Sequence, residues 1–263
     1  MRVHRDRGSG EGGPDMSGLM ILGVCGSPRN GNSAFLLGET MKAAAEAAPV
    51  GSRLESYTFR GKKFRACSSC YKCGELGGEC VIKDDFQALR DLWVAADVVI
   101  YSVPVYHMGM PGQVKCFIDR LGNSLFARYS PLYPPGRESL PRHLKAIGGV
   151  AQGIHAFSGQ ESTLTQLVNH ALLMQCVPVS GDMWECYIGA GGWTSNAIEK
   201  DALATQVAGG GFDAGVVAKA ARDVGRRCVE TALLLRAGGL AERARLADDP
   251  TYTPFLERIS GNG

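Results

Sequence analysis

Short apolar runs alternate along the chain with longer segments in which apolar residues recur every three or four positions. The short runs are typical of strands buried on both faces, and the longer segments predict amphipathic helices. We expect five strands, at residues 19–25, 53–59, 97–103, 145–150 and 176–183. We expect helices at residues 34–48, 111–125 and 213–236, and two more that open at Asp84 and Ser158.

This alternation of strands and helices predicts an α/β fold with a doubly wound, five-stranded parallel sheet of strand order 2-1-3-4-5. In such a sheet the ligand crevice lies outside the carboxyl ends of strands 1 and 3, where the strand order reverses. The loops that leave those two ends are residues 26–33 and 104–110. We therefore expect these two distant stretches to meet in one crevice.

Composition limits the class of protein. The 263 residues are 45% apolar and 21% charged with a net charge of +2, as in an ordinary soluble globular protein. No dense Lys/Arg stripe points to nucleic acid, and no apolar run is long enough to cross a membrane. Nine cysteines without a secretory signal indicate a cytoplasmic protein with reduced thiols.

We expect one folded domain over residues 18–240, with a cysteine-rich loop at 66–83 and a Gly-rich, irregular insertion at 188–212. The polar and glycine-rich residues 1–17 predict a disordered tail, and residues 241–263 predict a polar C-terminal tail.

One stretch, GSPRNGNS at residues 26–33, follows the first strand and precedes the first helix. Such a turn directs backbone N–H groups and the positive end of a helix dipole at one point, which favours a phosphate. Ser27, Asn32 and Ser33 add side-chain donors, and Arg29 adds a positive charge. The stretch has neither the G-x-G-x-x-G pattern of a dinucleotide site nor the Gly-Lys-Ser/Thr ending of a P-loop. It predicts a site for one terminal phosphate.

The cysteine-rich loop is the second candidate site, with the spacing Cys67-x2-Cys70-x2-Cys73-x6-Cys80. Soft thiolates in such numbers bind iron–sulfur clusters or zinc in tetrahedral arrays. The C-x2-C-x2-C run suits a cubane cluster better, because structural zinc usually takes two separated Cys-x2-Cys pairs. Thiols without metal, packed over a ligand or at a dimer contact, are the third alternative. The other five cysteines, 25, 116, 176, 186 and 228, have apolar neighbours and predict buried thiols.

A third stretch, PVYHMGM at residues 104–110, is specific enough to indicate a resemblance to a known family. Together with residues 26–33 and Lys115-x3-Asp119-Arg120, it is similar to the NADPH-dependent FMN reductase branch of the flavodoxin-like superfamily, over roughly residues 20–184. The resemblance implies that residues 26–33 hold the FMN phosphate. It also implies two sets of residues around the flavin ring: Pro104, Val105, Tyr106, His107, Met108 and Gly109 on the pyrimidine side, and Gly149, Gln152 and Gly153 of a loop at 148–153 on the other edge.

The cysteine run also resembles that of the iron–sulfur flavoproteins of this superfamily, which implies a [4Fe–4S] cluster on Cys67, Cys70, Cys73 and Cys80. The implied activity is an FMN-dependent oxidoreductase that passes electrons from NAD(P)H, or from a ferredoxin-like donor, to a quinone, a flavin or another small electrophile. Because no separate pyridine-nucleotide motif is visible, donor and acceptor are expected to take turns at one flavin face.

His107 and Tyr106 are the candidate catalytic residues, with His107 as a proton donor. Lys115, Asp119 and Arg120 are expected to form a set of salt bridges on a helix surface.

Two other functions stay open at this stage. One is an iron–sulfur flavoprotein that carries electrons between protein partners, and the other is a regulatory protein that uses the cysteine loop as a thiol or metal redox sensor. Relatives of this kind imply a homodimer or a homotetramer. Trp184, Tyr187 and Trp193 flank the Gly-rich insertion; they either line a substrate pocket or, more commonly, serve as packing anchors.

Overall fold

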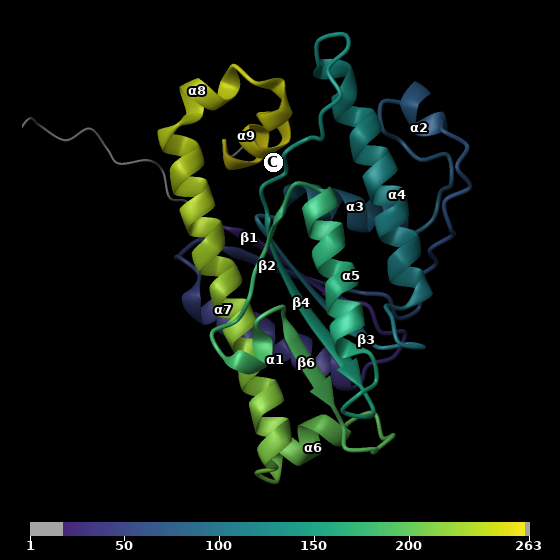
Figure 1. Cartoon of the computed structure of the whole chain (residues 1–263), viewed down its shortest axis with the longest axis vertical. Helices are drawn as coiled ribbons and strands as arrows, with labels where there is room; N and C mark the ends of the chain where they lie inside the picture. The colour runs from purple at the N-terminus through teal and green to yellow at the C-terminus, as the bar shows by residue number, and fades with distance from the viewer. Residues whose placement is uncertain (1–17, 261–263) are drawn as a thin grey trace, which may run out of the picture.

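The computed structural model describes residues 18–260, so the tail expected at residues 1–17 lies outside the described residues. A parallel sheet of order β2-β1-β3-β4-β5 has helices on both faces (Figure 1), which confirms the predicted doubly wound fold. The strands are β1 (Met20–Cys25), β2 (Arg53–Thr58), β3 (Val98–Pro104), β4 (Ala146–Gly153), β5 (Val177–Pro178) and β6 (Ala190–Trp193).

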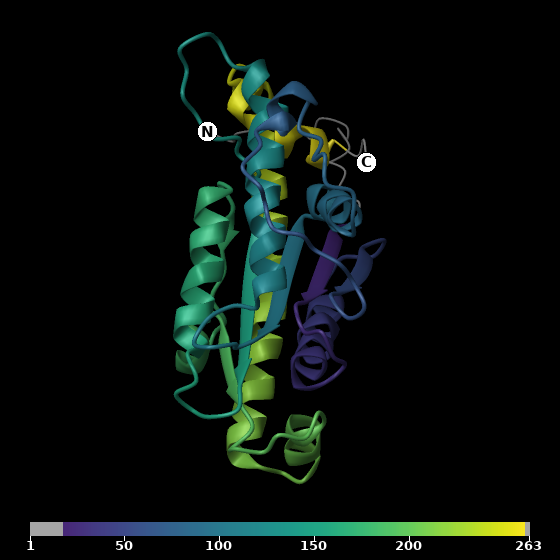
Figure 2. The same ribbon diagram turned by 90° about the vertical axis from the view of Figure 1, so that its right-hand side faces the viewer.

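The helices cover the sheet in two layers, and α7 runs along most of the length of the molecule (Figures 1 and 2). They are α1 (Asn32–Ala47), α2 (Lys72–Glu75), α3 (Phe86–Ala95), α4 (Gly112–Tyr129), α5 (Gln160–Leu173), α6 (Ala202–Ala208), α7 (Phe212–Ala241), α8 (Arg243–Ala247) and α9 (Thr253–Ile259). Short 3₁₀ turns occur at Ser130–Leu132, Trp184–Cys186 and Pro250–Tyr252. Among residues 18–260, no helix is both long and apolar enough to cross a membrane.

The core has two halves because successive strand residues point to opposite faces of the sheet. In β3, Val98 and Ile100 pack with α1 and α7, whereas Val99, Tyr101 and Val103 pack with α3, α4 and α5. All seven residues of β3 are buried, which explains why this strand is a nearly continuous apolar run. The predicted core cysteines 25, 176, 186 and 228 are buried, and Cys116 is partly exposed.

The outer edge of the sheet differs from the prediction. The strand expected at 176–183 pairs with β4 over only Val177–Pro178. The segment predicted as an irregular insertion contains β6, which pairs with the last four residues of β4, and the helix α6. Two short strands therefore share the fifth position of the sheet, one after the other along β4.

The predicted C-terminal tail is also wrong for residues 241–260, which form the end of α7, α8 and α9. Phe255 and Ile259 of α9 are buried, and the side chain of Arg258 donates a hydrogen bond to Asp97 at 2.9 Å. Arg258 also donates to the carbonyl oxygens of His143 at 2.6 Å and Leu144 at 3.1 Å. These contacts fix α9 against the amino ends of β3 and β4, opposite the predicted ligand crevice.

Candidate functional site

The turn at residues 26–33 lies beside the end of β3. The N–H of Gly26 donates to the carbonyl oxygen of Ser102 at 2.9 Å, and the Ser102 hydroxyl donates to the carbonyl oxygen of Ser33 at 2.7 Å. Ser27 and Ser33 are buried, and the Ser27 oxygen accepts the N–H of Arg29 at 3.2 Å. Gly31, not Asn32 or Ser33, is the N-cap of α1. With no side chain capping the helix, the N–H groups of its first turn are available to an anion.

Asn32 does not have the predicted freedom to bind a phosphate. Its side-chain oxygen accepts the backbone N–H of Leu203 at 3.0 Å, and its amide donates to the carbonyl oxygen of Glu199 at 3.1 Å. The backbone of Lys200 lies against Gly31 in the same contact, so that a Cβ on Gly31 would be 3.1 Å from the Lys200 oxygen. Asn32 therefore anchors residues 199–203 to the turn, which leaves Ser27, Arg29 and Ser33 as the side chains for a phosphate.

The loop after β3 is a tight hairpin. Tyr106 and Gly109 exchange backbone hydrogen bonds of 2.9 and 3.1 Å, and the two residues between them, His107 and Met108, have φ values of 49° and 65°. Left-handed backbone costs a residue with a side chain about 1–2 kcal/mol. Strain of this kind is concentrated at ligand sites. The side chains of Tyr106, His107 and Met108 are exposed at the tip.

The third segment of the candidate site begins where β4 ends. Residues 148–153 form part of β4 and not the predicted loop, and Gly149 lies in the sheet beneath Leu164 and Leu167 of α5. The loop that faces the hairpin is 154–159. Gly159 has φ 100°, and a Cβ there would lie 2.6 Å from Cα of Met108, so only glycine permits this approach. Of the residues predicted on this side, Gln152 and Gly153 at the strand end adjoin the crevice, and Gly149 does not.

A fourth segment, within the Gly-rich insertion expected at 188–212, lies beside these loops. After β6, the N–H groups of Thr194 and Asn196 donate to the carbonyl oxygen of Ile154 at 3.3 and 3.1 Å. The side chain of Asn196 is hydrogen-bonded to the His155 ring. Residues 194–203 thus connect the 154–159 loop to the turn at 26–33.

The four clustered cysteines are brought together. Cys67, Cys70, Cys73 and Cys80 line one pocket of about 30 Å³, which α4 closes on one side with Arg120, Asn123 and Ser124. Burial raises the pKa of the Cys73 thiol. The Lys72 N–H and the Ser68 hydroxyl lower the pKa of the exposed Cys70 thiol. Within residues 18–260, no three Cys, His, Asp or Glu side chains are grouped so as to hold a metal ion. The sulfurs surround a space instead of converging on one point.

Arg120 holds the base of the cysteine loop. Its side chain is 1% exposed and donates two hydrogen bonds, of 2.8 and 2.7 Å, to Asp84. It also donates to the carbonyl oxygens of Arg65 at 3.3 Å and Ile82 at 2.7 Å, which lie just outside the two ends of the cysteine run. The prediction of a surface salt bridge is therefore wrong for Arg120, although Lys115 and Asp119 do pair on the surface.

The cysteine pocket and the crevice lie at different heights along α4. The hairpin at residues 106–109 leads into Gly112, the first residue of α4, whereas Cys67 is hydrogen-bonded to Asn123. Eleven residues of helix separate Gly112 from Asn123, or about 16 Å at 1.5 Å per residue. Figures 1 and 2 show α2, which follows Cys70, beside the later half of α4. The cysteine pocket is therefore offset along α4 from the hairpin at 106–109.

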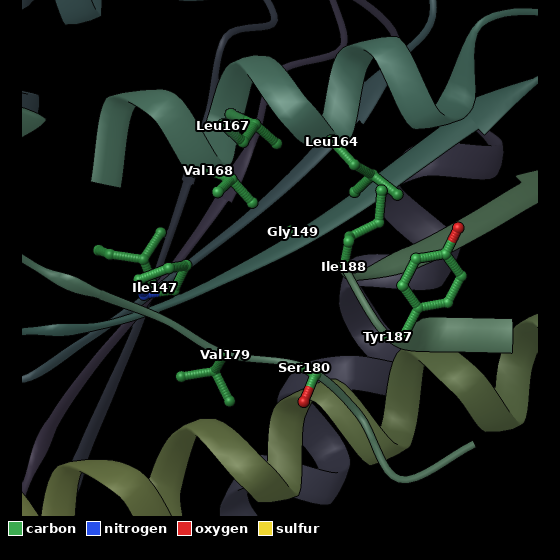
Figure 3. Close-up of a pocket in the computed structure, with 10 residues that line it drawn as sticks. Ile147, Gly149, Leu164, Leu167, Val168, Val179, Ser180, Tyr187 and Ile188 are labelled. Carbon is green, nitrogen blue, oxygen red and sulfur yellow. The ribbon is translucent and has the colours of Figure 1, made fainter. Parts of the chain in front are cut away.

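The aromatic residues near the insertion differ in exposure. Figure 3 shows a hollow of about 250 Å³ at the sheet edge, where Leu164, Leu167 and Val168 of α5 face the segment between β5 and β6. Tyr187 stands at one end of this hollow and donates a hydrogen bond to Glu161 at 3.2 Å. Trp184 is 90% exposed, so it is not packed as an anchor against residues 18–260. The hollow is the gap left where the chain passes from one edge strand to the next.

The fold and the crevice together define the class of protein. A parallel sheet of order 2-1-3-4-5, with a phosphate-type turn after its first strand and a ligand loop after its third, is the arrangement of the flavodoxin-like mononucleotide-binding proteins. The chain matches the NADPH-dependent FMN reductase family over residues 19–184 and belongs to it. It is therefore an NAD(P)H-dependent FMN oxidoreductase.

Individual relatives agree with this assignment. An iron-sulfur flavoprotein of Archaeoglobus fulgidus is 32% identical over 68% of this chain and 85% of its own length. One of Methanocaldococcus jannaschii is 30% identical over 66% of this chain and 82% of its own length. Among solved structures, a WrbA-like flavodoxin from Agrobacterium tumefaciens superposes with a TM-score of 0.50 at 17% identity, covering 81% of this chain and 97% of its own.

Proposed function

We propose that the protein takes electrons from NAD(P)H, or from a ferredoxin-like donor, and delivers them to a quinone, a flavin or another small electrophile. The observation that carries this proposal is the pair of loops at the reversal of the sheet: an uncapped helix N-terminus in the turn after β1, and a strained hairpin after β3. FMN supplies the redox chemistry when bound, because it exchanges electrons either singly or in pairs. The protein supplies position, hydrogen bonds and access.

We assign the phosphate to Ser27, Arg29, Ser33 and the first turn of α1. The residues for the ring are Pro104, Val105, Tyr106, His107, Met108 and Gly109 of the hairpin, with Gln152 and Gly153 at the end of β4. His107 stands exposed at the hairpin tip, where an imidazole can hold a proton for an incoming acceptor. Tyr106 offers a neighbouring ring and hydroxyl.

We also propose that Cys67, Cys70, Cys73 and Cys80 hold a [4Fe–4S] cluster. The donor set fits, since four soft sulfurs surround one space and each iron of such a cluster takes one thiolate. The names of the archaeal relatives point the same way. A volume of about 30 Å³ suits only one or two waters. Loading the cluster must therefore move the outer part of the loop, where Cys70 and Tyr71 are exposed, while Arg120 keeps its base fixed.

A second function, the transfer of single electrons between protein partners, is favoured by the exposure of Cys70 on the outer face of this loop. A protein partner could approach there without entering the crevice. We place the protein in the cytoplasm, because an exposed thiol cluster persists only in a reducing compartment. We expect a homodimer or homotetramer, as the family resemblance implies.

The phosphate assignment is tested by comparing FMN with riboflavin, which differs by the phosphate alone. Wild-type protein should bind FMN more tightly in a fluorescence titration, and Arg29→Ala should reduce that preference about tenfold, the effect of one charge-assisted hydrogen bond. Arg60→Ala, at an exposed arginine after β2, is the matched control. If Arg29→Ala weakens the binding of FMN and of riboflavin equally, Arg29 does not contact the phosphate. If FMN does not bind and NAD(P)H is not oxidised under anaerobic conditions, the function is wrong.

A further inference from the structure

Helix α4 directs nitrogen donors at the two ends of the cysteine run. The Asn123 amide donates to Sγ of Cys67 at 3.6 Å, and a guanidinium nitrogen of Arg120 donates to Sγ of Cys80 at 3.4 Å. One turn of the same helix carries both donors, because residues three apart lie on one helix face. The first and last thiols of the run are therefore bound to one rigid element, although about a dozen loop residues separate them in sequence.

These contacts involve sulfur itself, which distinguishes them from the rest of the loop's support. Arg120 also binds Asp84 and two carbonyl oxygens, and Ser124 donates to the carbonyl oxygen of Gly78. Those bonds fix the backbone. A hydrogen bond to a thiolate that ligates a cluster changes the cluster itself, because it stabilises the additional negative charge that reduction places on iron and sulfur.

We infer that Asn123 and Arg120 are positioning residues whose N–H···S hydrogen bonds to Cys67 and Cys80 raise the reduction potential of the cluster. This inference rests on the proposed [4Fe–4S] site. On this inference, donors on α4 set the reduction potential at which the cluster in the cysteine loop accepts or releases electrons.

Asn123 is the clean probe of the two. Its side chain is exposed, and among residues 18–260 it donates to Cys67 and to the carbonyl oxygen of Asp119, one turn earlier in its own helix. It also borders a hollow of about 430 Å³ between α4 and α5, so the side of it away from the cysteines is open. Arg120, in contrast, is buried and holds the loop base, and its replacement would disturb loop and potential together.

The experiment uses the whole chain, reconstituted anaerobically with iron and sulfide. Iron and sulfide per chain are measured first, and the midpoint potential of the cluster is then measured by a dye-mediated titration followed by electron paramagnetic resonance. Asn123→Ala removes the donor and Asn123→Asp replaces it with a negative charge. Asn169→Ala, at an exposed asparagine across the same hollow on α5, is the control.

We expect four irons per chain in every variant, an unchanged potential in Asn169→Ala, a more negative potential in Asn123→Ala and the most negative potential in Asn123→Asp. Unchanged potentials in both Asn123 variants, with the cluster intact, would overturn the inference and leave the cluster assignment standing. A loss of iron in Asn123→Ala would also overturn it, since the residue would then hold the loop and not tune the cluster. If wild-type protein binds no iron, the cluster proposal itself fails.

Discussion

The buried pair of Arg120 and Asp84 gives the sharpest prediction about stability. Their side chains are 1% and 5% exposed, and two hydrogen bonds join them. Burial opposes ionisation of Asp84, but the N–H groups of Arg65 and Phe86 and the guanidinium of Arg120 outweigh it and hold the pKa of this carboxyl below its ordinary value. Replacing Arg120 by Met keeps most of the volume and leaves Asp84 buried with only its two backbone donors.

Removing one partner of a buried ion pair costs about 3–5 kcal/mol. We expect Arg120→Met to lower the free energy of unfolding by about 3 kcal/mol, the lower end of this range. The reason is that Asp84 keeps its bonds to the Arg65 and Phe86 N–H groups. On the same helix, Lys115 pairs with Asp119 on the surface, where side chains 54% and 43% exposed are screened by water. Lys115→Met should cost less than about 1 kcal/mol. Arg120→Met also removes the bonds to the Arg65 and Ile82 carbonyl oxygens, so the difference between the two substitutions measures burial and these bonds together.

Urea unfolding of the two single variants, of Asp84→Asn and of the double variant Arg120→Met/Asp84→Asn completes the test. Since the two side chains act as one unit, the double variant should lose at least about 2 kcal/mol less than the sum of its single changes. If Arg120→Met destabilises no more than Lys115→Met, or if the single losses simply add, the pair does not hold the base of the cysteine loop.

Two further predictions concern the hairpin and a buried histidine. Met108→Gly relieves left-handed backbone, so the free energy of unfolding in urea should rise by about 1 kcal/mol; a loss of stability would show that this backbone is not strained. Burial lowers the pKa of His170 in the folded protein to about 4. In the unfolded chain this histidine takes up its proton already below about pH 6.5. The free energy of unfolding should therefore fall by up to about 3 kcal/mol as the pH drops from 6.5 to 4. His170→Asn should reduce that slope, and equal slopes in the two proteins would contradict the assignment.

The sequence was most informative where one physical signal dominated. The runs that form β1 and β3 are apolar because both faces of each strand are buried, so their positions were predicted to within one residue. The helix predicted to open at Asp84 begins at Phe86, two residues later. The Asp84 carboxylate accepts the N–H of Phe86, and the Gln87 side chain accepts the N–H of Asp84.

The errors have physical causes of their own. The loop that the resemblance implied at 148–153 overlaps the strand predicted at 145–150, and the structure extends that strand to Gly153. Gly148 and Gly149 lie in it because Cys228 and Val224 of α7, and Leu164 of α5, pack where their side chains would be. Strand β6 is mostly Ala and Gly and gains its order from pairing with β4. Arg120 looked like a surface residue because its partner Asp84 lies 36 positions away. His107 and Met108 carry no turn signal, so the hairpin was missed.

The two hydrogen bonds between Asn32 and residues 199–203 affect the order in which the protein folds during its synthesis. On the ribosome the turn at 26–33 emerges long before residues 199–203, which contact it, and α7, which closes one half of the core, emerges later still. The contact between the turn and residues 199–203 is therefore absent from the nascent chain until synthesis has passed residue 203. Any fragment ending near residue 184, where the family match stops, would present an open sheet edge and an uncovered apolar face to the cell. Flavin binding at the site we propose would therefore require synthesis past residue 203.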